Sequence, residues 1–578
     1  MENDNNITSL PEKPGSPAAQ AGQPVQLPLP AINAVNQVID DTVLHYINKY
    51  APANGQPPQV NPEDTEDVLL WEINDELEIR NSGILNAHRK YKLLSALPNF
   101  AVEKLLRGFY PVKCLDLNGG GAELGIYQWE GLKQGLYDTD LDAVKKLARR
   151  FKRSASERDL KEIVDQLKRE LPPVPLNNDK DLIAVNNGIF NYKTKTLARF
   201  SPELVFISKS KVDYNPNARN IVIHNQDDNT DFDLESWMGS LSDNPEITEL
   251  LWEVLGACIR PNVPWNKSVW MYSEMGNNGK GTLCALIQNL CGEGTCDSIN
   301  TSQFSNDAYL ENLPTLSAVI ADENRSGAYL DDVSNLKAAI TGDKITINRK
   351  YRTKLSFKFR GFIVQCFNEF PRVKDRTPSF LRRIILVPMK KCFTGRERKY
   401  IKEDYLQRPD VLEYALYRVL HTDYYELSEP QECKDALAAY NAYNNPLVRY
   451  WQEFRDRFAW DMLPYAFLYD LYKAWYKDTN PSGHPLSAAD FRVELKKNIS
   501  GDAVWEVLDS PRAPGNKMGK PEPLSMEYGL GKWQNSGYFG SNMDIRCTPV
   551  NLKSSYRGLI RRPAPSGGSI CADEETSG

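Results

Sequence analysis

The sequence lacks long apolar runs, an export signal and paired cysteine motifs. No stretch approaches the roughly 18 to 20 apolar residues of a membrane-spanning helix, and the polar, acidic N-terminus does not have the basic-then-apolar order of a signal peptide. The ten cysteines are scattered, and the closest pair, Cys291 and Cys296, has no second pair or histidine cluster to complete a zinc site. We therefore expect a cytoplasmic protein with reduced thiols and no membrane contact.

An excess of positive charge is also absent. Lys and Arg number 70 against 76 Asp and Glu, which gives a formal net charge of -6. This balance does not by itself indicate nucleic-acid binding. A basic patch can still lie within an acidic whole, so local motifs must decide the question. The length of 578 residues exceeds one hydrophobic core and predicts about three or four domains.

Changes of pattern along the chain predict a multidomain α/β protein. Short β-prone runs separated by Asn-Gly and Ser-Pro turn signals at 182–216 indicate a small strand-rich unit. Three helical patterns at 445–499, followed by a Gly-, Pro- and Asn-rich hairpin-like region up to Cys547, predict a winged helix. The predicted segments are a disordered leader (1–35), a mainly helical N-terminal region (36–125), a small domain (126–233), a mixed α/β domain (234–422), a winged-helix-like domain (423–550) and a flexible tail (551–578).

The stretch VWMYSEMGNNGKGTLCALIQNL indicates a phosphate-binding loop. A predicted strand at Ser268–Tyr272 leads through a glycine-rich turn into a predicted helix at Thr282–Leu290, which is the context of a P-loop. Glycines let backbone N–H groups converge on phosphate oxygens, and Lys280 meets the β- and γ-phosphates. The predicted nucleotide-binding residues are Gly276, Asn277, Asn278, Gly279, Lys280, Gly281 and Thr282.

The loop departs from the GxxxxGK[ST] pattern at two positions. Glu274 replaces the first glycine, and Gly281 replaces the hydroxyl residue that binds Mg²⁺. The metal role therefore falls to Thr282, alone or shared with water. An ordinary glycine-rich turn between a strand and a helix is the alternative interpretation.

A second apolar strand, LSAVIADEN at Leu316–Asn324, ends in the adjacent carboxylates Asp322 and Glu323. One carboxylate can hold the Mg²⁺ shell while the other polarises the attacking water, as at the end of a Walker B strand. A buried strand that runs into an acidic turn is the simpler alternative. The coincidence of this acidic strand end with a P-loop upstream favours the catalytic interpretation.

A third strand, predicted at Phe359–Pro371, ends in the polar Asn368, whose amide can orient the lytic water or contact the γ-phosphate. Arg382 and Arg383 follow, just before another apolar strand. An arginine that reaches the nucleotide of a neighbouring subunit stabilises transition-state charge. Considered alone, each arginine fits an ordinary surface residue at the start of a strand equally well.

The order of these motifs resembles that of the superfamily 3 helicases, in the phage, plasmid and poxvirus-type group with a primase C-terminal helicase. The resemblance is dense from about Trp237 to Leu420 and extends back to about Ile126. The stretches that carry it are GNNGKGTL, IADENRSGAYLDD, LKAAITGDKITINRKY, CFNEFPRVKDRTPSFLRRIILVP and YIKEDYLQRPDVLEYALYRVL.

This resemblance implies an AAA+-like motor that assembles as a ring, usually a hexamer, hydrolyses ATP with Mg²⁺ between subunits and moves along single-stranded DNA. The implied roles are phosphate and metal binding by Lys280 and Thr282, and metal and water binding by Asp322 and Glu323. Asn368 is the implied sensor, and Arg382 or Arg383 is the implied arginine finger that reaches the nucleotide of the neighbouring subunit.

The resemblance also implies a DNA-gripping hairpin between the second and third motif strands. Residues alternate around a basic turn in ITINRKYRTKLSFKF, Ile345–Phe359, as in a β-hairpin. Cations there can neutralise DNA phosphates and a tyrosine can stack on a base. A solvated hairpin tip is the alternative. The predicted DNA contacts are Arg349, Lys350, Tyr351, Arg352 and Lys354.

The sequence thus predicts an ATP-dependent replicative DNA helicase of a phage, plasmid or island, which acts on single-stranded or forked DNA in a bacterial cytoplasm. One alternative is an initiator that binds origin duplex DNA, with Arg492, Lys496 and Lys497 near phosphate. Another is a nonhelicase P-loop ATPase, such as a kinase or packaging enzyme, which needs neither the basic hairpin nor the arginine pair. A primase is disfavoured, because Asp138 and Asp140 lie in a turn before a helix, where Asp serves as a cap.

Overall fold

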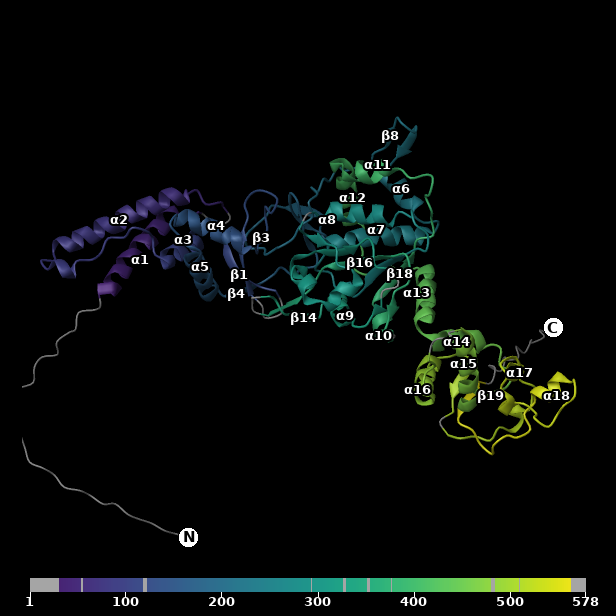
Figure 1. Cartoon of the computed structure of the whole chain (residues 1–578). Helices are drawn as coiled ribbons and strands as arrows, with labels where there is room; N and C mark the ends of the chain where they lie inside the picture. The colour runs from purple at the N-terminus through teal and green to yellow at the C-terminus, as the bar shows by residue number, and fades with distance from the viewer. Residues whose placement is uncertain are drawn as a thin grey trace, which may run out of the picture. The chain divides into compact units, whose positions relative to one another are not determined.

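The protein is a mixed α/β multidomain chain (Figure 1), as the sequence predicts. The computed structural model describes residues 31–52, 56–117, 122–292, 294–325, 329–350, 354–375, 377–479, 484–508 and 510–562. Contacts divide the chain into two compact units. The described residues up to Leu115, Ala122–Gly131 and Tyr137–Val174 form the first unit, and most of the remainder forms the second.

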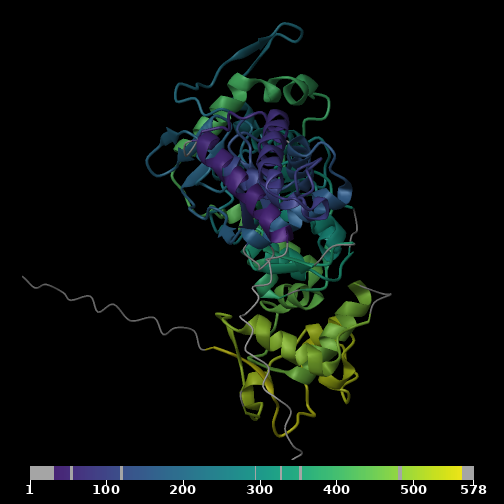
Figure 2. The same cartoon turned by 90° about the vertical axis from the view of Figure 1, so that its left-hand side faces the viewer.

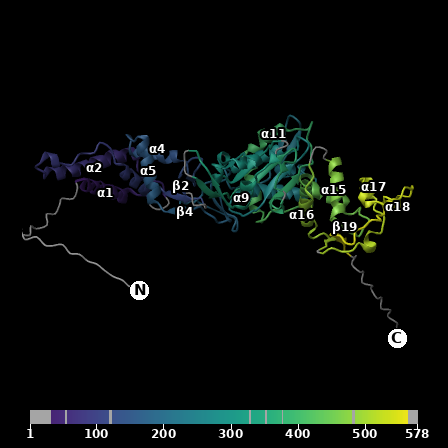
Figure 3. The same cartoon turned by 60° about the horizontal axis from the view of Figure 1, so that its bottom comes forward.

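The first unit is built from amphipathic helices whose ends are capped locally. The Asn61 side chain accepts a hydrogen bond from Glu63 N at the start of α2, and Ser156 and Asp159 form a reciprocal capping box at the start of α5. α1 and α2 lie side by side in both Figure 1 and Figure 3. The helices are α1 (Ala31–Tyr50), α2 (Pro62–Ser82), α3 (Asn99–Phe109), α4 (Leu141–Phe151) and α5 (Glu157–Glu170); the sheet has the order β3-β2-β1-β4, with strands Tyr137–Asp138, Ala122–Tyr127, Val112–Asp116 and Pro173–Pro175.

A small strand-rich part opens the second unit, where the turn signals predict it. β5 (Leu182–Val185), β6 (Gly188–Asn191) and β7 (Thr196–Ala198) form an antiparallel sheet, and β8 (Ile223–Asn225) pairs with β9 (Thr230–Phe232). Arg260 links the residues that follow β6 to the segment around Tyr424 in the same unit. Its guanidinium is 3.6 Å from the centre of the Tyr192 ring and donates a 2.9 Å hydrogen bond to the carbonyl of Tyr424.

A parallel sheet forms the centre of the second unit, with the strand order β11-β12-β16-β10-β18. The strands β10, β12, β16 and β18 are buried and largely apolar, as expected when helices cover a parallel sheet. The P-loop strand β10 lies between β16 and β18, both of which come later in the chain. The strands are β10 (Ser268–Tyr272), β11 (Cys296–Asp297), β12 (Ala318–Ala321), β16 (Phe362–Phe367) and β18 (Ile384–Pro388).

Helices and two small ladders surround this sheet. The helices are α6 (Leu234–Ser240), α7 (Pro245–Ile259), α8 (Lys280–Cys291), α9 (Ser334–Thr341), α10 (Pro378–Leu381), α11 (Lys399–Glu403), α12 (Pro409–His421) and α13 (Gln431–Asn444). The ladders pair β13 (Tyr329–Leu330) with β17 (Arg372–Val373), and β14 (Lys344–Ile347) with β15 (Leu355–Lys358).

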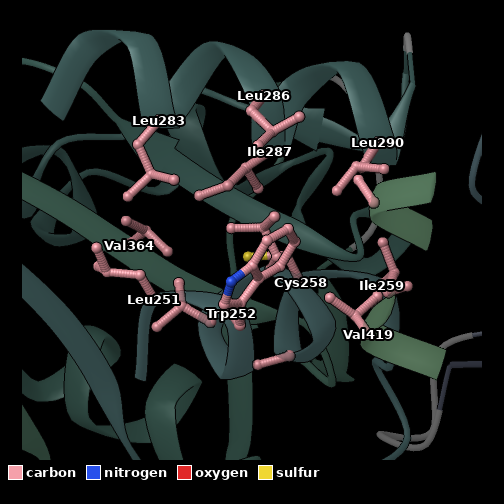
Figure 4. Close-up of a cluster of buried hydrophobic side chains, with 14 of the residues drawn as sticks. Leu251, Trp252, Cys258, Ile259, Leu283, Leu286, Ile287, Leu290, Val364 and Val419 are labelled. Carbon is pink, nitrogen blue, oxygen red and sulfur yellow. The ribbon is translucent and has the colours of Figure 1, made fainter. Parts of the chain in front are cut away.

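The core between α7, α8 and the sheet fixes the start of the P-loop helix. Figure 4 shows Leu283, Leu286 and Ile287 of α8 above Trp252 of α7 and Val364 of β16. All five side chains are at least 98% buried. Removing one of these large apolar side chains would cost about 2–5 kcal/mol, so the orientation of α8 is set by packing beneath the loop.

The C-terminal part has its own aromatic core, formed by helices and a small antiparallel sheet. Tyr450, Trp475, Phe491 and Trp505 are fully buried in it, and the helices lie beside one another in Figures 1 and 2. The predicted three helices are present. The elements are α14 (Pro446–Phe454), α15 (Tyr465–Thr479), α16 (Ala488–Ile499), α17 (Leu524–Glu527) and α18 (Met543–Cys547), with strands β19 (Met462–Pro464), β20 (Trp505–Val507) and β21 (Gly558–Arg561) in the order β19-β21-β20.

Three local predictions differ from the structure. Beyond the strand β20, the hairpin-like region before Cys547 forms short helices, including α17 and α18, because Pro and Asn start helical turns there. Part of the predicted flexible tail is the central strand β21, held by ladders to β19 and β20. At the other end, α1 begins at Ala31, inside the predicted leader, while residues 1–30 lie outside the described part.

No helix among the described residues is long and apolar enough to cross a bilayer.

Asp140 caps α4 by accepting a hydrogen bond from Asp142 N at 3.0 Å. The capping interpretation of the YDTDLD stretch is therefore confirmed.

Candidate functional site

The predicted motifs meet at one edge of the parallel sheet. The P-loop follows β10, Asp322 and Glu323 follow β12, and Asn368 follows β16. Because these strands are parallel, their carboxyl ends lie at the same edge, where ligands bind in open α/β sheets. Chain order reverses around β10, which places the P-loop at a topological switch point.

The backbone of the P-loop takes conformations that favour glycine and asparagine. Gly279, the N-cap of α8, has φ +85°, and Asn277 has φ +52°. A Cβ at Gly279 would stand 2.6 Å from Leu241 Cδ2, so bulk is excluded as well. The buried Asn278 bonds to the carbonyl of Met275 and accepts from Lys280 N at 3.3 Å. These features hold the loop open at the N-terminus of α8, the end of a helix that favours anions.

Lys280 and Asn368 are direct partners. The Lys280 ammonium donates a 3.1 Å hydrogen bond to the Asn368 side-chain oxygen. Burial lowers the pKa of Lys280, and the nearby thiols of Cys366 and Cys284, which are 3.4 Å apart, oppose this shift. No Asp or Glu among the described residues forms an ion pair with this buried ammonium, whose hydrogen-bond partner is Asn368, so it can gain charge compensation from a phosphate.

Asp322 and Glu323 are exposed at the carboxyl end of β12. Among the described residues, no group of three or more His, Cys, Asp or Glu is placed to hold a metal ion. A Mg²⁺ ion at this edge would therefore use one or two protein oxygens together with phosphate oxygens and water, which is its usual mode at nucleotide sites. The half-exposed Thr282 and these carboxylates fit that mode in donor type.

Asn324 fixes the turn that carries the two carboxylates. The sequence motifs did not indicate this residue as part of the site. Its side-chain nitrogen donates to Gln365 Oε1 at 3.0 Å and to the carbonyl of Cys366 at 3.1 Å. Its oxygen accepts from the backbone and hydroxyl of Thr301, each at 3.0 Å. The amide is thus fully bonded in a buried position and joins the ends of β12 and β16.

The two candidate arginines have different surroundings. The Arg383 guanidinium donates to the carbonyl and, at 2.8 Å, to the hydroxyl of Ser379 in α10. The backbone carbonyl of Arg383 accepts from Ser268 N at the start of β10. Arg382 is exposed, and no hydrogen bond or ion pair joins its side chain to another described residue.

The predicted basic hairpin is present as β14 and β15. Ile345 pairs with Phe357 and Ile347 with Leu355, all four buried, so the ladder is anchored from one face. Arg349 and Lys350 follow β14, and the exposed Lys354 precedes β15. Tyr351 and Arg352 lie outside the described residues.

A cavity of about 550 Å³ adjoins the P-loop in the same unit, and no sequence motif indicated it. Asn277, Gly279 and Thr282 form one side of it. The other sides come from β9, α6 and the segment 393–403, which are distant in sequence from the loop. Several cations and aromatic rings line these sides.

Three family models match the chain. The model described as D5 N terminal like matches residues 86–256, and that described as Poxvirus D5 protein-like matches residues 442–509. Between them, residues 271–383 match a family of unknown function, DUF5906. The predicted resemblance to the poxvirus-type helicase group is confirmed by the two D5 matches, and DUF5906 contains the P-loop and both following motif strands. No curated protein sequence matches.

Two similar solved structures have low scores. The A form apo structure of the NrS-1 C terminal region has a TM-score of 0.40 and 13% identity over 80% of this chain and 99% of that one. A JCV helicase bound to an acetamide compound has a TM-score of 0.24 and 16% identity over 36% of this chain and 58% of that one.

Proposed function

From the chain's resemblance to the poxvirus D5-type group of superfamily 3 helicases, we propose that it is an ATP-dependent DNA helicase of a mobile genetic element. The observation that carries the proposal is the contact between Lys280 and Asn368. It brings the P-loop and the third motif strand together at the carboxyl edge of the sheet, beside the strand that ends in Asp322 and Glu323.

In this proposal the P-loop binds the triphosphate of ATP. The N–H groups at the start of α8 and the Lys280 ammonium face phosphate oxygens, and Thr282 and Asp322 hold the metal shell. Mg²⁺, when bound, neutralises phosphate charge. Glu323 accepts a proton from the attacking water, and Asn368 orients that water or senses the γ-phosphate.

The exposed arginine of the pair completes the site from a neighbouring subunit. Because Arg383 is bonded to Ser379 of its own chain, we assign the role in trans to Arg382. Such an arginine typically contributes roughly 10³ to 10⁵ in rate. A ring, expected to be a hexamer, gives every site a neighbour.

The basic hairpin couples the motor to DNA in the proposed mechanism. Its base is fixed, because Asp307 Oδ2 accepts from the backbone and side chain of Asn348, both at 2.9 Å. Arg349, Lys350 and Lys354 bind phosphates of the single strand. A shift of the hairpin on hydrolysis then pulls the strand, and the partner strand is displaced.

An origin-binding initiator is the second candidate. Arg492, Lys496 and Lys497 are exposed on α16, the third helix of the C-terminal part, which is followed by antiparallel strands. A winged helix places its third helix against duplex DNA in a comparable order of elements. This function can coexist with the motor.

The proposal is tested by measuring ATP turnover against the concentration of single-stranded DNA. We expect turnover to rise several-fold to saturation for the wild-type chain and to be lost in Lys280→Ala. Turnover that does not respond to DNA would favour a nonhelicase ATPase instead.

A further inference from the structure

The cavity beside the P-loop is continuous with the loop itself. Phe393 N donates a 2.7 Å hydrogen bond to the carbonyl of Asn277, and the Asn277 side chain donates to Thr394 and Glu397 at 3.3 and 3.0 Å. At Gly279, a Cβ would touch both Leu241 and Phe393. The apolar floor of the cavity therefore begins where the phosphate-binding backbone ends.

The far wall of the cavity is held in place by the β8–β9 hairpin. The Tyr400 hydroxyl on α11 donates to Asp228 Oδ2 at 2.6 Å, and the Arg398 guanidinium lies 3.8 Å from the same carboxylate. Asn225 of the hairpin donates to the Tyr405 hydroxyl at 3.0 Å. The segment 393–403 is thus bonded on one side to the P-loop and on the other to the hairpin, so the cavity has fixed walls.

Aromatic and apolar groups line the part of the cavity beyond the loop. Phe232, Trp237, Leu241 and Phe393 are among them, and Trp237 is only half-buried, so part of its ring remains accessible. A flat aromatic ligand can stack on such a ring. The volume of about 550 Å³ is within the range of small-molecule sites.

A cation lies at the P-loop end of the cavity. The Lys402 ammonium is 3.8 Å from the Cβ position of Gly281, so it lies at the N-terminus of α8. Arg396, Arg398 and Lys399 line the same cavity. Four carboxylates line it as well, namely Asp231, Asp233, Glu397 and Glu403, so the cation placed for the anionic end of a ligand is Lys402 at the helix terminus.

We propose that this cavity is the nucleoside subsite of the nucleotide site, with the base stacked on Trp237 and Lys402 bound to the phosphate nearest the ribose. This inference rests on the proposed function, since it requires the triphosphate to occupy the P-loop. It adds that α6 and the segment 393–403 select the ligand. Because stacking accepts any base, selection is for a nucleotide over inorganic polyphosphate.

The experiment compares ATP with inorganic tripolyphosphate by isothermal titration calorimetry on the full chain with Mg²⁺. Wild type is expected to bind ATP at least tenfold more tightly than tripolyphosphate. Trp237→Ala should weaken ATP binding by about tenfold, in line with the loss of one stacking contact, and change tripolyphosphate binding less than twofold. Trp237→Phe should retain most of the ATP affinity.

Matched controls separate the subsite from general effects. Trp71→Ala removes an exposed tryptophan on α2 and should leave both affinities unchanged, as should Lys161→Gln on α5. Lys402→Gln should weaken both ligands, since it removes a phosphate contact.

The outcomes distinguish this inference from the function on which it rests. Equal wild-type affinities for ATP and tripolyphosphate would overturn the nucleoside subsite and leave the phosphate site standing. Unchanged ATP binding in Trp237→Ala, or equal weakening of both ligands in that variant, would also overturn it. Binding of neither ligand by the wild-type chain would refute the proposed function together with the subsite.

Discussion

The Lys280 ammonium donates a hydrogen bond to the side-chain oxygen of Asn368, 88 residues further along the chain. One residue comes from the loop that is predicted to bind phosphate and the other from the strand end that is predicted to sense it. The contact uses one of the three N–H donors of the ammonium. A phosphate oxygen that accepts from another of these donors would lie beside Asn368, which ties the position of Asn368 to the state of the nucleotide.

Asn368→Ala tests this link between Asn368 and the nucleotide. We expect kcat for ATP hydrolysis to fall by roughly one to two orders of magnitude, as for loss of a positioning group in catalysis, while ATP affinity stays within a few-fold. Glu369→Ala, at the exposed neighbouring position, is the control. Steady-state kinetics together with direct ATP titration measure the two effects. An unchanged kcat in Asn368→Ala would exclude the sensor role.

The lowered pKa of Lys280 predicts proton uptake on ATP binding. Burial lowers this pKa in the free chain, and phosphate charge raises it again in the complex. Between the two values ATP binding takes up a proton, so the apparent affinity falls as the pH rises through that window. In the free chain the sign is opposite: stability rises with pH there, because the unfolded chain retains a proton that the folded chain releases.

Calorimetry at alkaline pH in two buffers with different heats of ionisation measures this uptake. The wild-type binding enthalpy should depend on the buffer. Lys280→Met, if it retains measurable binding, should lose that dependence. Equal enthalpies in both buffers for the wild type would contradict the assigned contact between lysine and phosphate.

Substitutions of Arg382 and Arg383 should have different effects when variant subunits are mixed. Arg382→Ala subunits mixed with Lys280→Ala subunits should regain part of the ATPase activity, because one interface in the mixed ring then has both intact groups. Arg383→Ala should instead lower the melting temperature, since its bonds to Ser379 hold α10 against β18; the cost is about 1–3 kcal/mol. Absence of recovery with Arg382→Ala would argue against a site shared between subunits.

Lys350→Ala should uncouple ATP turnover from DNA. Basal ATPase is expected to remain, while DNA stimulation falls and the salt dependence of single-strand binding decreases by about one unit of slope. Lys161→Ala, on α5, is the matched control. Fluorescence anisotropy over a salt series gives the slope. If Lys350→Ala keeps the wild-type DNA stimulation and the wild-type salt dependence, the hairpin is a solvated tip that does not bind DNA.

Asn324→Leu should damage both stability and catalysis. It leaves Gln365 and the Thr301 hydroxyl without their partner inside the core, which costs about 2–4 kcal/mol of unfolding free energy. The turn that carries Asp322 and Glu323 loses its anchor, so hydrolysis should fall more than ATP affinity. Chemical denaturation and single-turnover hydrolysis measure the two effects. Full hydrolysis at reduced stability would restrict Asn324 to a structural role.

Local signals predicted the strand β10 at its observed bounds, because an apolar run flanked by Ser268 and a glycine-rich turn is unambiguous. Asp322, Glu323 and Asn368 were selected because each follows an apolar run, and the parallel sheet brings those strand ends together. Asn324 could not be selected this way. Its partners, Thr301, Gln365 and Cys366, are 23 to 42 residues away, and only the packed sheet brings them within hydrogen-bond distance.

The cavity and the strand β21 were missed for a related reason. The cavity needs Trp237 and Lys402, which lie about 40 residues before and about 120 residues after the P-loop, and no local sequence signal gave either a role at the site. β21 is short, and its ladder partner β19 lies about one hundred residues upstream, so tertiary pairing rather than local propensity forms the strand.

The most direct test of the account is strand displacement from a forked DNA duplex with a single fluorescent label, at fixed protein concentration, with and without ATP. The account predicts displacement by the wild-type chain only with hydrolysable ATP, and none by Lys280→Ala or Lys350→Ala. Displacement that proceeds equally without ATP, or in Lys280→Ala, would contradict the coupling of nucleotide hydrolysis to DNA movement.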